Sequence, residues 1–138
     1  MYLFDNTGAA LLFGLLISLG AFAQDGMPRA EYKVGKERIE ANFKTAKEAC
    51  DSLAGNQKDI CVAEAKGDRN VALAELEARY KPGEKARYNI QAAKAEAVYE
   101  VAKERCDDQS GNAKDVCVKQ AKADEKTAKA EAEAQMRK

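Results

Sequence analysis

The sequence predicts an all-α fold made of two tandem antiparallel helical hairpins, each clamped by a disulfide bond. The segment CDSLAGNQKDIC, from Cys50 to Cys61, recurs 56 positions later as CDDQSGNAKDVC, from Cys106 to Cys117. Aligned without a gap around these segments, 19 of 35 positions are identical, which indicates an internal duplication. Each copy separates two long Ala/Glu/Lys-rich stretches, a composition typical of helices.

Two arrangements of the hairpins satisfy this pattern. They can fold back on each other as a four-helix bundle, or they can lie end to end as an extended rod. A lone hairpin buries little apolar surface, and this favours the bundle. Large apolar residues in both halves, among them Leu76 and Val98, would then face each other in its core.

The N-terminal segment resembles a signal peptide over residues 1–23. Residues 9–19, AALLFGLLISL, form an apolar run too short to span a bilayer as a stable helix, and residues 21–23, AFA, supply a small-x-small cleavage pattern. The mature chain is expected to begin at Gln24. The segment contains no Lys or Arg and carries Asp5, so the position of the true N-terminus stays open, and the alternative to cleavage is a retained membrane anchor.

The mature chain is expected to form one domain, 24–138, whose first repeat covers about residues 29–81. Pro28 can open a helix over about 29–53, because proline suits the first turn. A second helix is expected over about 57–80. Apolar residues recur every three or four positions along both helices: Ile39, Phe43, Ala46, Cys50 and Leu53, then Val62, Ala65, Leu73, Leu76 and Tyr80.

The second repeat covers about residues 84–138. Pro82 and Gly83 form the joint, since proline cannot continue a helix and glycine readily leaves one. Helices are expected over about 84–109 and 113–137. Their apolar positions are Tyr88, Ala92, Ala95, Tyr99, Ala102 and Cys106, then Val116, Ala121, Ala128 and Ala132.

Each repeat contains a turn with the same three residues, in the first copy Gly55, Asn56 and Asp59. Glycine adopts the left-handed conformation that ends a helix. Asparagine is a preferred N-cap, and an aspartate three residues later can reach back to the cap. The second copy has Gly111, Asn112 and Asp115 at these positions.

The four cysteines are expected to pair within the repeats, as Cys50–Cys61 and Cys106–Cys117. Zinc ligands usually come in pairs two to four residues apart and often include histidine, whereas these pairs enclose ten residues and the chain has no histidine. Reduced structural thiols are the other alternative. A disulfide needs Cα atoms closer than ordinary helix pairs allow, so small residues are expected along the seam: Ala46, Ala65, Ala102 and Ala121.

Composition argues against several classes of function. Lys and Arg together number 23, as do Asp and Glu, so there is no net charge to attract nucleic acid or acidic lipid. The charges alternate at the i,i+3 and i,i+4 spacing of solvated helices. Without histidine, a phosphate-binding glycine loop or a nucleophile beside a base, the sequence predicts no enzyme, no metal and no cofactor.

Aromatic residues provide the one candidate ligand site. Phe43, Tyr88 and Tyr99 could line a groove between the hairpins, although the alternative is that they are core residues.

The repeated C-x10-C hairpin with Gly-Asn-x-Lys-Asp resembles a group of small exported proteobacterial proteins, commonly labelled hypothetical or TolA-like cell-envelope proteins. The likeness covers EYKVGKERIEANFKTAKEACDSLAGNQKDICVAEAK and its copy AVYEVAKERCDDQSGNAKDVCVKQAK. It implies export and helical structure, and it transfers no catalytic residue.

The leading functional expectation is therefore a non-enzymatic periplasmic protein that acts as a structural or interaction module of the envelope. Stress is a candidate trigger of its production, and no stable membrane insertion is expected after cleavage of the signal peptide. Its partners would be envelope proteins or further copies of itself. A binding module for an apolar ligand or an unfolded client is the alternative. A third hypothesis is a peptidoglycan tether through Lys138, because the chain ends in Arg-Lys like the major outer-membrane lipoprotein.

Overall fold

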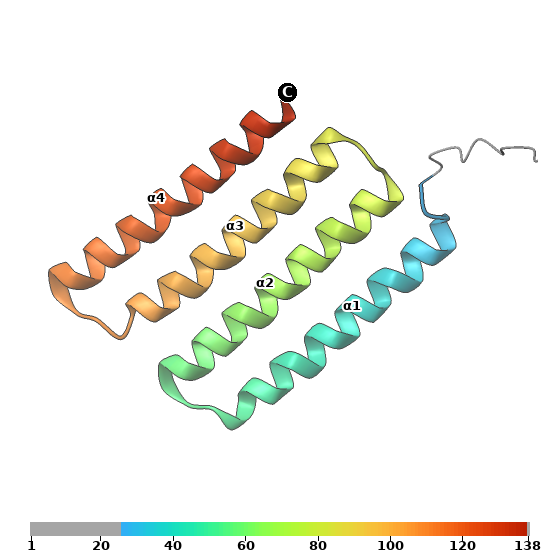
Figure 1. Cartoon of the computed structure of the whole chain (residues 1–138). Coiled ribbons are helices and arrows are strands. Elements are labelled where there is room, and N and C mark those ends of the chain that lie inside the picture. Colours follow the sequence, from blue (N-terminus) through green and yellow to red (C-terminus); the bar gives the residue numbers. More distant parts are fainter. Residues whose placement is uncertain (1–25, 138) are drawn as a thin grey trace, which may run out of the picture.

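The computed structural model describes residues 26–137, so the expected signal peptide and Lys138 lie outside the described residues. Four helices account for nearly all of this range (Figure 1). They are α1 (Arg29–Ala49), α2 (Gly55–Tyr80), α3 (Glu84–Cys106) and α4 (Gly111–Met136), with a short 3₁₀ turn, η1 (Cys50–Ser52), after α1. The all-α prediction is confirmed. The first and third helices end about three residues earlier than expected because the chain tightens into turns after each first cysteine.

The helices form an antiparallel row in chain order. α1 packs on α2, α2 on α3, and α3 on α4 (Figure 1). Between residues 26 and 137, no other pair of helices brings Cα atoms within 8 Å. Contact between α2 and α3 excludes the end-to-end rod and confirms a bundle of two hairpins. This bundle is open, because α1 and α4 are its two edges.

The joint between the hairpins explains why they fold back. α2 ends at Tyr80 and α3 begins at Glu84, so only three residues connect them. Pro82 prevents α2 from continuing, and Gly83 provides an extended residue before α3. A connection this short makes its two helices antiparallel neighbours.

The core is thin and consists mostly of small residues. Leu76 is the largest fully buried side chain, and its methyl groups lie against Gly35 of α1. A Cβ atom built at Gly67 would lie 2.7 Å from the Cβ of Ala97, so α2 and α3 approach closely there. The remaining buried apolar residues are Cys50, Ala63, Ala65, Ala95, Cys106, Ala121 and Ala132.

Polar contacts supplement this core inside the first hairpin. Arg69 of α2 donates to both carboxylate oxygens of Glu40 on α1, at 2.6–2.9 Å. This arrangement lowers the pKa of Glu40, chiefly through the hydrogen bonds from Arg69. Tyr32 stacks on Tyr80 with ring centroids 4.3 Å apart. Together these contacts hold α1 on α2 at two points, Tyr32 and Glu40.

Candidate functional site

Both predicted disulfides are present. Cys50 is bonded to Cys61 and Cys106 to Cys117, and the Cα atoms in each pair are 5.7 Å apart. No cysteine of the described chain is free. Two such bonds place the protein in an oxidising environment. Among the small residues expected beside them, Ala65 and Ala121 are buried, whereas Ala46 is exposed and Ala102 lies half-buried.

The glycines of the two turns are left-handed, as predicted, since Gly55 and Gly111 both have φ of +57°. The predicted capping by Asn56 and Asn112 is wrong. α2 and α4 begin at these glycines, so their N-cap residues are Ala54 and Ser110, and neither helix start has a side-chain cap.

Asn56 instead joins the hairpins. Its Nδ2 donates to the backbone oxygen of Glu104 at 2.7 Å and to Oδ1 of Asp108 at 2.8 Å. Because the helix begins two residues earlier than expected, Asn56 falls within its first turn and faces α3. Asp59 does not cap its helix either, and lies in a groove beside Glu104. Asp115, its counterpart in α4, provides no cap hydrogen bond.

An ion pair closes each turn, and sequence reasoning missed it. Lys58 Nζ lies 2.9 Å from Asp51 Oδ1, and Lys114 Nζ lies 3.0 Å from Asp107 Oδ1. The hydrogen bond from Lys58 lowers the pKa of Asp51. The signal was visible in the sequence, because an aspartate after the first cysteine and a lysine seven residues later occur in both repeats.

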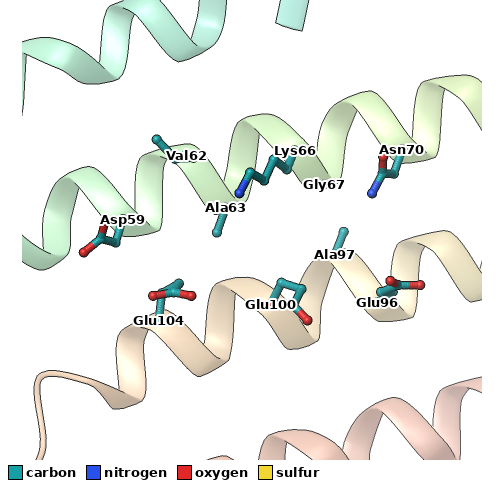
Figure 2. A pocket seen from close by; sticks show the side chains of 10 residues that line it. All are labelled: Asp59, Val62, Ala63, Lys66, Gly67, Asn70, Glu96, Ala97, Glu100 and Glu104. Atoms are coloured by element: carbon teal, nitrogen blue, oxygen red, sulfur yellow. The ribbon is translucent and has the colours of Figure 1, made fainter.

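One broad face of the helix layer carries an acidic groove between α2 and α3 (Figure 2). Glu96, Glu100 and Glu104 line the α3 side, opposite Asp59 and Lys66 of α2. Lysine side chains neutralise part of this charge, since Lys103 Nζ lies 3.0 Å from Glu100, which raises the pKa of Lys103. Within 26–137, no group of three or more His, Cys, Asp or Glu is placed to hold a metal ion.

The opposite face carries an apolar ridge on α3, formed by Val98, Val101 and Ala102 and called here the α3 ridge. Val98 lies about 200° around the helix from both Glu96 and Glu100, given about 100° per residue. A groove of about 520 Å³ borders the ridge towards α2, and another of about 400 Å³ borders it towards α4. Val98 lines both grooves and is 68% exposed, so the expectation that it joins the core is wrong.

The three aromatic residues of the predicted ligand groove are not brought together. Phe43 lies on α1, where the Arg69 guanidinium covers its ring at 5.4 Å. Tyr99 lies in the other hairpin, under Lys122 Nζ at 4.4 Å. Tyr88 lines a separate pocket near the end of α4. Tyr88 and Tyr99 line two different grooves, and no Cα atom of α1 lies within 8 Å of α3 or α4.

The second hairpin contains a buried carboxylate that the sequence pattern did not reveal. Glu125 is 6% exposed, and it accepts hydrogen bonds from Lys122 and Lys129, each at 2.6 Å. These two bonds lower its pKa. Both lysines lie one turn from Glu125 on the same helix, so the charge is compensated locally and requires no ligand.

No helix among residues 26–137 combines the length and the hydropathy needed to cross a membrane. Comparison of the chain with protein-family models, curated proteins and solved structures found no match.

Proposed function

We propose that the protein is a non-enzymatic interaction module of the bacterial periplasm, and that the α3 ridge is where another envelope protein binds. The observation that carries the proposal is Val98, a valine 68% exposed on an ordered helix between two apolar grooves. Exposed apolar surface on a hydrophilic helix layer is a usual mark of a binding surface. The disulfides and the expected signal peptide at residues 1–23 support export.

The surroundings of the ridge support a protein partner. Its centre is apolar, while charged side chains border the grooves, as in protein interfaces with an apolar core and a polar rim. The charged rim residues are Glu64, Asp68 and Arg105 on one side and Lys94, Asp124 and Glu131 on the other. Carboxylates predominate, so the partner is expected to surround an apolar side chain with lysine or arginine.

The two clamped hairpins favour such a role. A surface that is already ordered loses little conformational entropy when a partner binds. Val98 belongs to α3, an inner helix supported on both sides by α2 and α4. The ridge is therefore held in place before binding.

Site-specific photo-crosslinking in living cells tests the proposal. A benzoylphenylalanine is placed at position 98, and at position 42 as the control, because exposed Asn42 occupies the same place in the first repeat. We expect discrete protein adducts from position 98 alone, and co-expression of untagged wild-type chain should reduce them by competition. We also expect osmotic shock to release the oxidised protein. Equal labelling at both positions, or a cytoplasmic protein with free thiols, would contradict the proposal.

The same grooves support a second candidate, a module that binds an apolar ligand or an unfolded client. In that case position 98 would give a smear of many adducts instead of discrete bands. The purified protein would also bind the dye 1-anilinonaphthalene-8-sulfonate and slow aggregation of a reduced, unfolded protein. Val98→Glu would weaken both effects, whereas Asn42→Glu would not.

A further inference from the structure

The geometry points to head-to-tail self-association, in which the outer edge of α4 in one copy packs on the outer edge of α1 in the next and repeats the α2·α3 contact. The partner is a second copy of this chain. This surface lies at the edges of the helix layer, away from the α3 ridge, so the inference is independent of the proposed function.

The first step is that the hairpins are structurally the same unit. The residues at the starts of α2 and α4 have nearly identical backbones, with φ and ψ of −132° and 160° at Ala54 and −133° and 160° at Ser110. Both hairpins have the same Cα separation across the disulfide. A shift of 56 positions therefore relates α2 to α4 and α1 to α3, and any contact between α2 and α3 has an equivalent between α4 and the α1 of another copy.

The second step is the surface that α2 and α3 cover in each other. Gly67 packs closely against Ala97, and buried Ala63 lies on the same stripe of α2. Helical spacing puts Ile60 on this stripe and Ile90 on the facing stripe of α3. Both isoleucines are half-buried.

The same stripes are open at the edges of the layer. Val116 of α4 stands at the position of Ile60 and is 56% exposed, and Val34 of α1 stands at the position of Ile90 and is 54% exposed. These are two of the four large apolar residues exposed in the described chain, one on each edge. Small residues follow them along each stripe, and all are exposed: Ala123 and Ala130 on α4, Ala30 and Ala41 on α1.

Two of the polar contacts between the hairpins also have counterparts. The ion pair between Arg105 and Glu64 has none, because Ala49 and Gln120 stand at the equivalent positions. Lys94 Nζ of α3 lies 3.4 Å from Glu75 of α2, and the equivalent pair is Arg38 of one copy with Glu131 of another. Neither Arg38 nor Glu131 has an ion-pair partner within the described chain. Asn56 bonds the backbone oxygen of Glu104, and the matching Asn112 has the backbone oxygen of Glu48 in the next copy as its acceptor.

Two further differences make the intermolecular contact weaker than its internal template. Ala123 replaces Gly67, so α4 cannot approach the next α1 as closely as α2 approaches α3. Lys119 replaces the buried Ala63. Ala63 and Glu104 line one groove between α2 and α3, so the equivalent Lys119 would lie across from Glu48 of the next copy. Attraction between these two charges offsets part of the cost of covering Lys119. The contact is heterologous, so copies add in succession and do not stop at a two-fold dimer.

Sedimentation velocity over a concentration series tests the inference on the exported protein with both disulfides intact. We expect the weight-average sedimentation coefficient to rise beyond that of a dimer. Val34→Glu blocks the α1 edge, where it meets Glu131 of the preceding copy. Val116→Glu blocks the α4 edge, where it meets Glu48 of the next copy. Each should weaken association at least about tenfold. Asn89→Glu on the inner helix α3 is the control and should have no effect.

Mixing the two blocked variants identifies the geometry. Val34→Glu keeps an intact α4 edge and Val116→Glu keeps an intact α1 edge, so an equimolar mixture should form heterodimers and nothing larger. A wild-type protein that stays monomeric at millimolar concentration would overturn the inference. So would a dimer that resists both substitutions, or homodimers that either variant forms as readily as the wild type. Loss of crosslinking at position 98 would leave the inference intact, because that surface is separate.

Discussion

Replacing Leu76 with alanine tests how much of the fold depends on the largest buried side chain among residues 26–137. Leu76 is 2% exposed and lies against Gly35. The substitution removes three carbon atoms, worth about 2.4 kcal/mol at roughly 0.8 kcal/mol per buried CH₂ group. Gly35 has no side chain to fill the space, so a cavity remains and raises the expected loss to about 3 kcal/mol of unfolding free energy.

Urea and thermal unfolding, followed by far-ultraviolet circular dichroism on the oxidised protein, measure this loss. We expect a lower urea midpoint with an unchanged m-value, because the folded state stays equally compact. The melting temperature should fall by about 12 °C, at roughly 4 °C per kcal/mol for a domain of this size. Val98→Ala is the control, since a 68% exposed valine should change stability by no more than about 0.5 kcal/mol.

Gly35→Ala supplies the second half of a double-mutant cycle. A Cβ atom at Gly35 would lie 2.7 Å from Cδ1 of Leu76, so the alanine clashes in the wild-type protein. In Leu76→Ala the clash is absent, and the methyl group partly fills the cavity while gaining up to about 1 kcal/mol in helix propensity. We expect a coupling free energy of at least about 1 kcal/mol. A loss below about 1 kcal/mol for Leu76→Ala, or the same effect of Gly35→Ala in both backgrounds, would refute the reasoning.

Three further predictions concern the polar and covalent contacts. Asn56→Ala should lower the unfolding free energy by about 1 kcal/mol, measured by urea titration, because it removes the hydrogen bond to Glu104. Asn112→Ala should leave the unfolding free energy of dilute protein unchanged. Glu125→Gln should lower it by about 1–2 kcal/mol at pH 7. The pKa of Glu125 is lower in the folded state than in the unfolded state. The difference in unfolding free energy between Glu125→Gln and the wild type should therefore persist above the unfolded pKa of about 4.3 and vanish as the pH falls through the folded pKa. A difference that stays constant over this pH range would argue against the charged pair. Loss of either disulfide, by a double Cys→Ser substitution, should lower the unfolding free energy by about 2–3 kcal/mol relative to the oxidised wild-type protein.

The hairpins and their disulfides were predictable because the constraints are local. Gly55 and Gly111 mark the turns, and cysteines one helical turn to either side must then face each other. Pro82 and Gly83 likewise mark the joint. These positions depend on backbone conformation over a few residues, which residue type strongly determines.

The side-chain contacts were harder to predict, because the apolar pattern of a helix does not identify which other helix packs on each of its apolar faces. Phe43 and Tyr99 have the spacing of core residues, but a heptad pattern does not say which helix covers them. Asparagine is a residue type that suits a cap, but α2 starts two residues earlier than its pattern predicts, and Asn56 therefore faces α3. The buried state of Glu125 depends on two lysines whose spacing also fits an ordinary solvated face.

The open arrangement follows from how many apolar stripes each helix carries. An inner helix needs two stripes, and α2 has them: Leu76 on the side of α1, and Gly67 with Ala63 on the side of α3. The outer stripes of α1 and α4 combine one valine each with alanines and charged residues, and their contact is too weak to offset the cost of bringing the two edges of one molecule together. Closure would also require the layer to curl and to bury charged residues of one broad face, at a large cost in desolvation. The stripes that closure would have used therefore stay at the edges, where only another molecule can reach them.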